Sequence, residues 1–159
     1  MQQDVLSTVS VIIASVSVTL GVVYYLLNSR RARKREKIDI VMRFYASFNT
    51  KEFHDADSLV LEAEFTDFAD FIKQYGPPTG QKPIHLAIRQ ISSAYELLGF
   101  LLHNKFIDLS MVWPIFEVER HWETIQPIAY AARKAYNDPN YLHYFEYLYN
   151  QWQTAKKPQ

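Results

Sequence analysis

A long stretch without charge near the N-terminus constrains the fold of this chain most strongly. From Val5 to Leu27 no residue is charged, and Val, Ile and Leu dominate these 23 residues. As an α-helix the stretch would extend roughly 34 Å, whereas a bilayer core about 30 Å thick needs around 20 apolar residues. Tyr24 and Tyr25 lie near its end, where aromatic rings favour the headgroup level. The pattern predicts a transmembrane helix rather than a buried core helix, which at this length would usually carry some charge.

A strongly basic block follows the uncharged stretch. Residues 30–37 hold six of the 17 Lys and Arg residues. The N-terminus itself carries Asp4 and no basic residue, and no A-x-A site precedes the block, so a cleaved signal peptide is disfavoured. We expect an uncleaved single-pass anchor with the N-terminus outside and residues 28–159 in the cytoplasm. The residues expected at the lipid headgroups are Arg30, Arg31, Arg33, Lys34, Arg35 and Lys37.

The same block could in isolation be a nuclear-import signal or a nucleic-acid patch. Its position directly after the uncharged stretch favours the stop-transfer interpretation. The rest of the chain is mildly acidic, because residues 38–159 hold 11 Lys and Arg against 15 Asp and Glu. A duplex-binding domain would instead spread basic residues over one face. We therefore predict membrane lipid as a partner and no nucleic acid.

Small residues recur along one face of the predicted membrane helix, with spacings of three and four. Such a stripe lets two membrane helices approach closely. Small residues also fill eight of positions 5–21, so the stripe is compatible with ordinary composition as well. The alternative that it indicates is contact with a second copy or with another subunit. The stripe consists of Ser7, Ser10, Ala14, Ser17 and Gly21.

The remainder of the chain shows helical periodicity and no sustained alternation of the kind that strands require. The fold class is therefore all-α: one N-terminal transmembrane helix that continues into a cytoplasmic bundle of five to seven helices. Thr50 and Thr66 are expected caps, Pro127 marks a kink or a break, and Pro139 suits a first helical position. The predicted helices are 51–63, 66–75, 84–104 and 139–154, and the predicted segments are 1–29 (anchor), 30–50 (basic juxtamembrane helix), 51–155 (helical domain) and 156–159 (tail).

No motif of a known chemistry stands out. The chain has no cysteine, which removes disulfides, thiolate catalysis and cysteine-ligated metals. The stretch GPPTGQKP at 76–83 is a surface loop or a hinge, and its prolines lack the N–H donors of a phosphate-binding loop. Two pairs at helical spacing, Glu117 with His121 and His143 with Glu146, could form a metal site if their helices meet, but surface ion pairing is the simpler explanation of the spacing. The sequence predicts no catalytic residue, metal site or cofactor.

Two carboxylates in apolar surroundings are candidates for structural ion pairs. Glu96 lies in AYELLGFLL and Glu146 in HYFEYLY. The face of Glu96 is either solvated or buried against an arginine, with Arg89, Arg120 and Arg133 as candidates. Glu146 most simply pairs with an arginine of a facing helix. A buried pair of this kind would be structural.

Several segments of the chain resemble a known family. They are AYELLGFLLHNKFID, the Trp and Pro of RHWETIQPIAYAARK, and YFEYL. Over roughly residues 30–150 the chain is similar to an uncharacterised family of small prokaryotic membrane proteins with one span and a helical domain of unknown function. The resemblance implies this architecture and a pairing of Glu96 or Glu146 with Arg133, but no activity or cofactor. The matching positions are Glu96, Gly99, Trp122, Arg133, Phe145 and Glu146.

These patterns favour a membrane-anchored helical interaction, scaffold or accessory protein without evident catalytic activity. It would bind a protein partner beneath the membrane or associate with itself through the membrane helix. One alternative is a membrane-tethered metal-dependent enzyme that uses Glu117, His121, His143 and Glu146. Another is a sensor that reads anionic lipid through the basic juxtamembrane helix.

Overall fold

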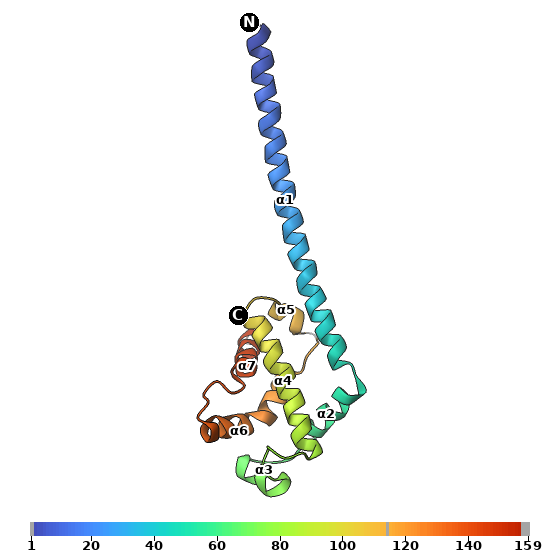
Figure 1. Cartoon of the computed structure of the whole chain (residues 1–159), viewed down its shortest axis with the longest axis vertical. Coiled ribbons are helices and arrows are strands. Elements are labelled where there is room, and N and C mark those ends of the chain that lie inside the picture. The colour runs from blue at the N-terminus through green and yellow to red at the C-terminus, as the bar shows by residue number, and fades with distance from the viewer. Residues whose placement is uncertain (1, 114, 157–159) are drawn as a thin grey trace. The chain divides into compact units, whose positions relative to one another are not determined.

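The computed structural model describes residues 2–113 and 115–156, with side chains from residue 24 onward. Within these residues the chain forms seven helices and no strand, which confirms the all-α prediction (Figure 1). The helices are α1 (Gln2–Phe48), α2 (Lys51–Leu61), α3 (Phe68–Tyr75), α4 (Pro83–His103), α5 (Leu109–Val112), α6 (Val118–Tyr136) and α7 (His143–Lys156).

The chain divides into two compact units, residues 1–39 and residues 40–159. The first unit is helical throughout its described part and belongs to α1. Among the described residues, no helix combines the length and the apolarity that a membrane crossing requires. The side chains of residues 5–23, which make up most of the predicted span, lie outside the described part. The span therefore stays a prediction.

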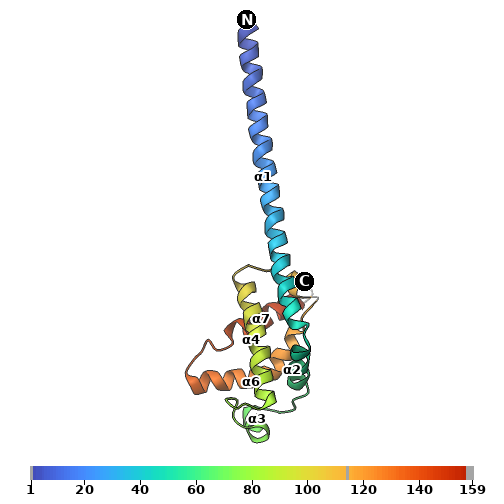
Figure 2. The same ribbon diagram turned by 45° about the vertical axis from the view of Figure 1, so that its right-hand side comes forward.

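The second unit is organised around α4, which packs against both α2 and α7. In Figure 1 this helix lies between those two neighbours. Its sequence predicts one apolar stripe at helical spacing. All six side chains of that stripe are buried: Ile84, Ile88, Ile91, Tyr95, Leu98 and Leu102. The helix thus supplies the centre of the core, and Figure 2 shows it beside α6 and α7 from a second direction.

The starts of α2 and α3 show which side chains satisfy the free N–H groups of a first helical turn. Thr50 caps α2 as predicted, since its hydroxyl oxygen accepts the N–H of Phe53 at 3.2 Å. The prediction that Thr66 caps α3 was wrong. Asp67 is the cap and accepts the N–H of Asp70, while the Asp70 carboxylate accepts the N–H of Thr66. These two bonds occupy Thr66 through its backbone, and the helix begins at Phe68 instead of the predicted residue 66.

The predicted boundaries near the C-terminus also need correction. The helix α6 continues through Pro127. Of the two predicted alternatives at this residue, a kink or a break, the break is therefore excluded. The carbonyl of Glu123, which loses its partner at Pro127, belongs to a solvent-exposed residue, and solvent can satisfy it. The helix α7 begins at His143 rather than near Pro139. Leu142, with a φ of 54°, adopts a left-handed conformation that no helix can include, so residues 138–142 form a loop.

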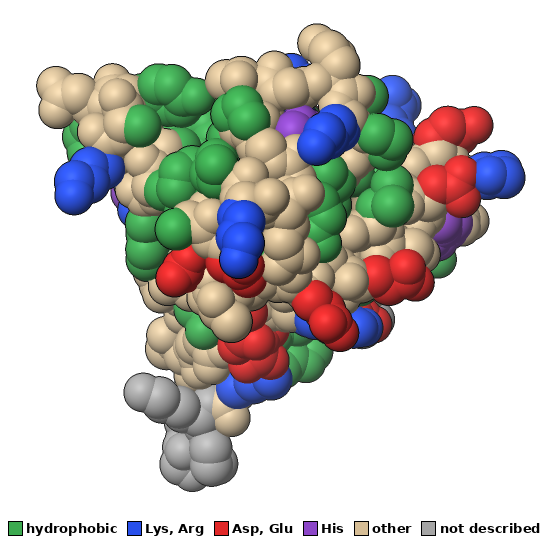
Figure 3. Space-filling model, turned by 90° about the horizontal axis from the view of Figure 1, so that it is seen from below, with side chains coloured by type: hydrophobic (Ala, Val, Ile, Leu, Met, Phe, Trp, Pro, Cys, Tyr) green, Lys and Arg blue, Asp and Glu red, His purple; other side chains and the backbone are tan. Residues whose placement is uncertain are grey.

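The surface of the second unit is mixed in charge. On the face drawn in Figure 3, basic side chains lie apart from one another, whereas acidic side chains gather in groups among apolar and polar ones. This distribution agrees with the acidic balance of residues 38–159, which hold 11 basic and 15 acidic residues. A face of this kind is typical of an ordinary solvated surface.

Candidate functional site

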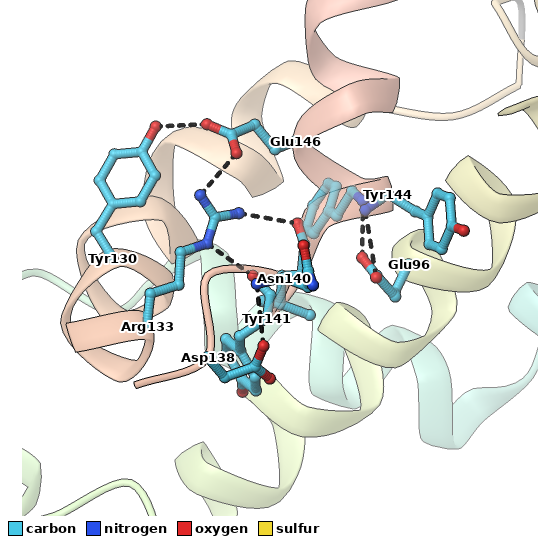
Figure 4. A network of polar contacts seen from close by, with 10 residues as sticks. Glu96, Tyr130, Arg133, Asp138, Asn140, Tyr141, Tyr144 and Glu146 are labelled. Atoms are coloured by element: carbon cyan, nitrogen blue, oxygen red, sulfur yellow. Dashed lines mark hydrogen bonds and ion pairs between the residues drawn. The ribbon is translucent and has the colours of Figure 1, made fainter. Parts of the chain in front are cut away.

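The junction between α6 and α7 is held by the side chain of Arg133. Its Nε donates to the carbonyl of Tyr141 at 2.9 Å, and its Nη1 donates to a carboxylate oxygen of Glu146 at 2.7 Å. Nη2 reaches the carbonyl of Leu142 at 3.4 Å, and the hydroxyl of Tyr130 donates to the second oxygen of Glu146 at 2.8 Å (Figure 4). The planar guanidinium thus fastens the loop before α7 and the first turn of α7 to α6.

Glu96 binds the start of the same helix from α4. Its two carboxylate oxygens accept the backbone N–H groups of Tyr144 and Phe145, at 3.2 and 2.8 Å (Figure 4). A helix N-terminus leaves N–H groups without partners and carries a partial positive charge, so a carboxylate there supplies both acceptors and a favourable charge. The residue before α7 is Leu142, whose side chain has no acceptor, so a side chain from another helix performs the capping.

The three residues predicted as structural ion pairs are therefore used in two ways. Arg133 and Glu146 lie together as a partly buried ion pair, with 18 % and 25 % of their side chains exposed. Glu96 serves backbone N–H groups instead of an arginine. All three residues act on the first turn of α7. The predicted helix start near Pro139 placed that turn elsewhere, so the prediction did not reveal this shared role.

A second polar cluster lies deeper in the domain, around His121 of α6. His121 is 3 % exposed. Its Nε2 lies 2.5 Å from a carboxylate oxygen of Asp57 on α2, and its Nδ1 lies 2.7 Å from the carbonyl oxygen of Glu117 and 3.1 Å from the hydroxyl of Tyr95 on α4. The ring therefore joins three helices. The Tyr95 ring also stacks on Phe145 of α7, with centroids 4.8 Å apart.

The proton inventory of this cluster follows from its acceptors. A carbonyl oxygen can only accept, so Nδ1 of His121 carries a proton that points toward Glu117 and Tyr95. One further proton lies between Nε2 and Asp57, so the two residues together carry no net charge, as an ion pair or as a neutral pair. Burial raises the pKa of Tyr95, and the nearby Asp57 and Glu117 raise it further, so the phenol keeps its proton. The hydrogen-bonded series of Asp57, His121 and Tyr95 could hold or pass a proton. Both ring nitrogens of His121 already have partners, so neither is free to bind a metal.

The His121 cluster faces a cavity of about 330 Å³, which we call the His121 cleft. Aromatic rings from α1, α2, α4 and the segment before α6 form its walls, and polar side chains stand among them. Tyr45 and Ile115 are large apolar residues at the cleft, and 40 % and 37 % of their surfaces remain exposed. The lining residues are Tyr45, Phe48, Asn49, Phe53, His54, Asp57, Leu61, Tyr95, Ile115, Phe116, Glu117, Arg120 and His121.

The metal cluster considered from the sequence does not assemble in the described part of the chain. There, no group of three or more His, Asp or Glu side chains is arranged to hold a metal ion. His121 is bound to Asp57, and Glu146 is bound to Arg133 and Tyr130. His143 contacts the ring of Tyr144.

Sequence reasoning missed Asp57 and Tyr95 as members of a polar cluster. A signal was present for Asp57, which lies four residues after Phe53 and three before Val60, both buried. It therefore shares the inward face of α2, where a lone carboxylate needs a partner. Tyr95 was assigned correctly to the apolar stripe of α4, but nothing in that stripe reveals which residue its hydroxyl contacts.

The residues predicted for the membrane region can be placed only in part. Five of the six basic side chains are exposed on α1, and Lys37 is partly buried. The proposed small-residue stripe lies outside the residues whose side chains are described: Ser7, Ser10, Ala14, Ser17 and Gly21.

Residues 11–152 match a protein family described as a domain of unknown function, DUF4760. The chain belongs to this family. The match covers the resemblance seen in the sequence and establishes that the relatives form an uncharacterised family. No curated protein and no solved structure matches the chain.

Both polar clusters lie inside the DUF4760 region. The region begins before the basic block and ends within α7, so it includes the His121 cleft and the Arg133 junction. The family description assigns no activity. Any function must therefore be argued from the residues of the chain themselves.

Proposed function

We propose that this DUF4760 protein is a membrane-anchored helical interaction protein and that its second unit binds a partner protein in the His121 cleft. The observation that carries the proposal is the cleft itself, with aromatic walls and with Tyr45 and Ile115 left exposed beside it. Aromatic pockets of this kind receive the anchor side chains that dominate protein interfaces. The Asp57–His121 pair lines the cleft and, together with Tyr95, joins α2, α4 and α6.

Substitution at the cleft tests the binding proposal. Full-length protein carrying Ile115→Glu should recover at least about ten-fold less partner from detergent-solubilised membranes, because a charge would enter an apolar contact. Leu97→Glu is the matched control, since Leu97 is a 49 % exposed residue of α4 that does not line the cleft. A strictly monomeric protein that recovers no partner would reject the proposal.

The anchor is the second part of the proposal. The uncharged residues 5–27 and the basic block after them support an outside N-terminus and a cytoplasmic second unit. Because the chain has no cysteine, single cysteines report topology directly. A membrane-impermeant maleimide should label Gln3→Cys in intact cells and Ala155→Cys only after lysis. The reverse pattern, or release of the protein by alkaline extraction, would contradict the anchor.

Self-association through the membrane helix belongs to the same proposal. Leucine at Ser17 or Gly21 would fill the small-residue face and should reduce crosslinked dimer in membranes. Thr19→Leu lies off the stripe and is the control. Equal dimer yields in all three variants would leave partner binding to the second unit alone.

A second candidate function is the recognition of anionic lipid by the basic block. The exposure of Arg30, Arg31, Arg33, Lys34 and Arg35 on α1 favours it, since each free basic side chain can add about 1 kcal/mol of attraction to an anionic surface. Residues 28–159 should co-sediment with phosphatidylserine vesicles and lose this binding at high salt. Glutamine at the five arginine and lysine positions should abolish it. Binding that ignores lipid charge and salt would exclude this function.

A further inference from the structure

A second cavity of about 230 Å³ lies in the same unit and shares no lining residue with the His121 cleft. We call it the His85 cavity, after its most buried polar side chain. His85 is 2 % exposed, and neither of its ring nitrogens has a hydrogen-bond partner among the described atoms. Both nitrogens are also closed to solvent, and the ring edge with Nδ1 lies toward Gly80, so the ring forms one wall of the cavity and leaves hydrogen bonding with an occupant to other lining residues.

The loop before α4 is built around this histidine. A Cβ on Gly80 would lie 2.5 Å from Nδ1 and 2.8 Å from Cε1 of His85, so only glycine lets the loop lie against the ring. Arg89, one turn further along α4, reaches the carbonyl oxygen of Gly80 with its Nη2 at 3.4 Å. The GPPTG stretch, which the sequence identifies only as a loop or hinge, is therefore one wall of the cavity.

The chemistry of the lining favours an anion. Arg89 supplies the only formal charge among the lining residues, and none of them is acidic. The hydroxyls of Tyr136 and Tyr141 add neutral donors, and burial raises the pKa of Tyr141, which keeps its proton in place. Ile88 and Ile128, both buried, form an apolar wall.

We propose that the His85 cavity binds a small monocarboxylate that carries one compact apolar or aromatic group. The carboxylate would pair with Arg89 and accept hydrogen bonds from the phenols, and the apolar group would lie against Ile88 and Ile128. An apolar cavity of about 150 Å³ is known to hold one benzene ring, so 230 Å³ suits one ring with its carboxylate. This site is independent of the proposed partner binding in the His121 cleft.

Benzoate is the probe, and benzamide, of nearly the same shape but without charge, is its control. Full-length protein in detergent solution is titrated with each while the heat of binding and the histidine ring resonances are recorded. Benzoate should bind saturably with one molecule per chain and shift the ring signals of His85. Benzamide should bind at least about ten-fold more weakly, because it cannot form the ion pair with Arg89.

Variants of Arg89 separate charge from fold. Its side chain is solvent-exposed, so Arg89→Gln should fold and should weaken benzoate at least about ten-fold, whereas Arg89→Lys should retain most of the affinity. Arg120→Gln, at the His121 cleft, is the matched control and should bind benzoate unchanged. Failure of benzoate to saturate, equal binding of benzamide, or an unaltered affinity in Arg89→Gln would each overturn the proposal.

Discussion

Gly99 of α4 faces the backbone of Tyr144 in α7 so closely that a Cβ at position 99 would lie 1.9 Å from the Tyr144 carbonyl oxygen. The next two atoms in reach would be the carbonyl carbon at 2.5 Å and the Cβ of Tyr144 at 3.2 Å. Two of these three atoms are backbone, so no rotamer change can relieve the contact. The glycine therefore sets the distance between the two helices, and that distance lets Glu96, one turn earlier, reach the first turn of α7.

Alanine at Gly99 should separate α4 from α7. Because the clash is with backbone, we expect Gly99→Ala to lower the free energy of unfolding by about 3 kcal/mol, despite the higher helix propensity of alanine. Urea unfolding of the full-length protein, followed by circular dichroism, measures the change. Ser93→Ala, at an exposed position of the same helix, should be neutral or slightly stabilising. Equal stability of Gly99→Ala and the parent protein would contradict the close approach.

Glu96 offers a second test of the α7 start. Glu96→Gln retains an oxygen acceptor but loses the charge beside the helix N-terminus, and should cost about 1 kcal/mol. The amide protons of Tyr144 and Phe145 should exchange faster with solvent in this variant, which a general loss of stability would not single out. Glu123→Gln, an exposed change on α6, is the control. Unchanged exchange at these two amides would remove Glu96 as the cap.

The ion pair at the α6–α7 junction can be measured by a double-mutant cycle. Arg133→Met removes a guanidinium that serves a carboxylate and two loop carbonyls, and should cost about 2 kcal/mol. Glu146→Gln should cost less, and the coupling energy of the two substitutions should be about 1.5 kcal/mol. A coupling near zero would show that Arg133 acts only through the loop carbonyls.

The sequence predicted most of the fold and little of the candidate site, for reasons that particular residues illustrate. The apolar stripe of α4 and the Thr50 cap depend on neighbours three or four residues away, and both were predicted correctly. The start of α7 depends on Glu96, 48 and 49 residues earlier in the chain, and on the left-handed Leu142. The bond between His121 and Asp57 spans 64 residues. Contacts of this range depend on how the helices pack, which periodicity alone does not specify.

The Asp57–His121 bond predicts unequal effects at two neighbouring acids of α2. Asp57→Asn places an amide against Nε2 of a buried ring and should cost about 2 kcal/mol. Asp55→Asn breaks only a pair with Lys51 whose side chains are 60 % and 81 % exposed, and should leave the stability nearly unchanged. Thermal unfolding of the two variants side by side measures the difference. If both variants unfold at the same temperature, the buried pair contributes nothing to stability.

Acid should weaken the domain partly through Glu146. Burial alone would raise the pKa of this carboxyl, but hydrogen bonds from Tyr130 and Arg133 and the charges of Arg133 and His143 outweigh it and lower the pKa below its ordinary 4.5. The unfolded chain therefore binds the proton more readily, so the stabilisation is complete above pH 4.5 and is lost as the pH falls through the lower folded value. Glu146→Gln should start less stable at neutral pH and lose less stability between pH 5 and pH 3 than the parent protein. Urea unfolding at a series of pH values measures both slopes.

Glu123→Gln, an exposed acid of α6, should follow the parent slope. Parallel slopes in the parent and in Glu146→Gln would contradict the lowered pKa.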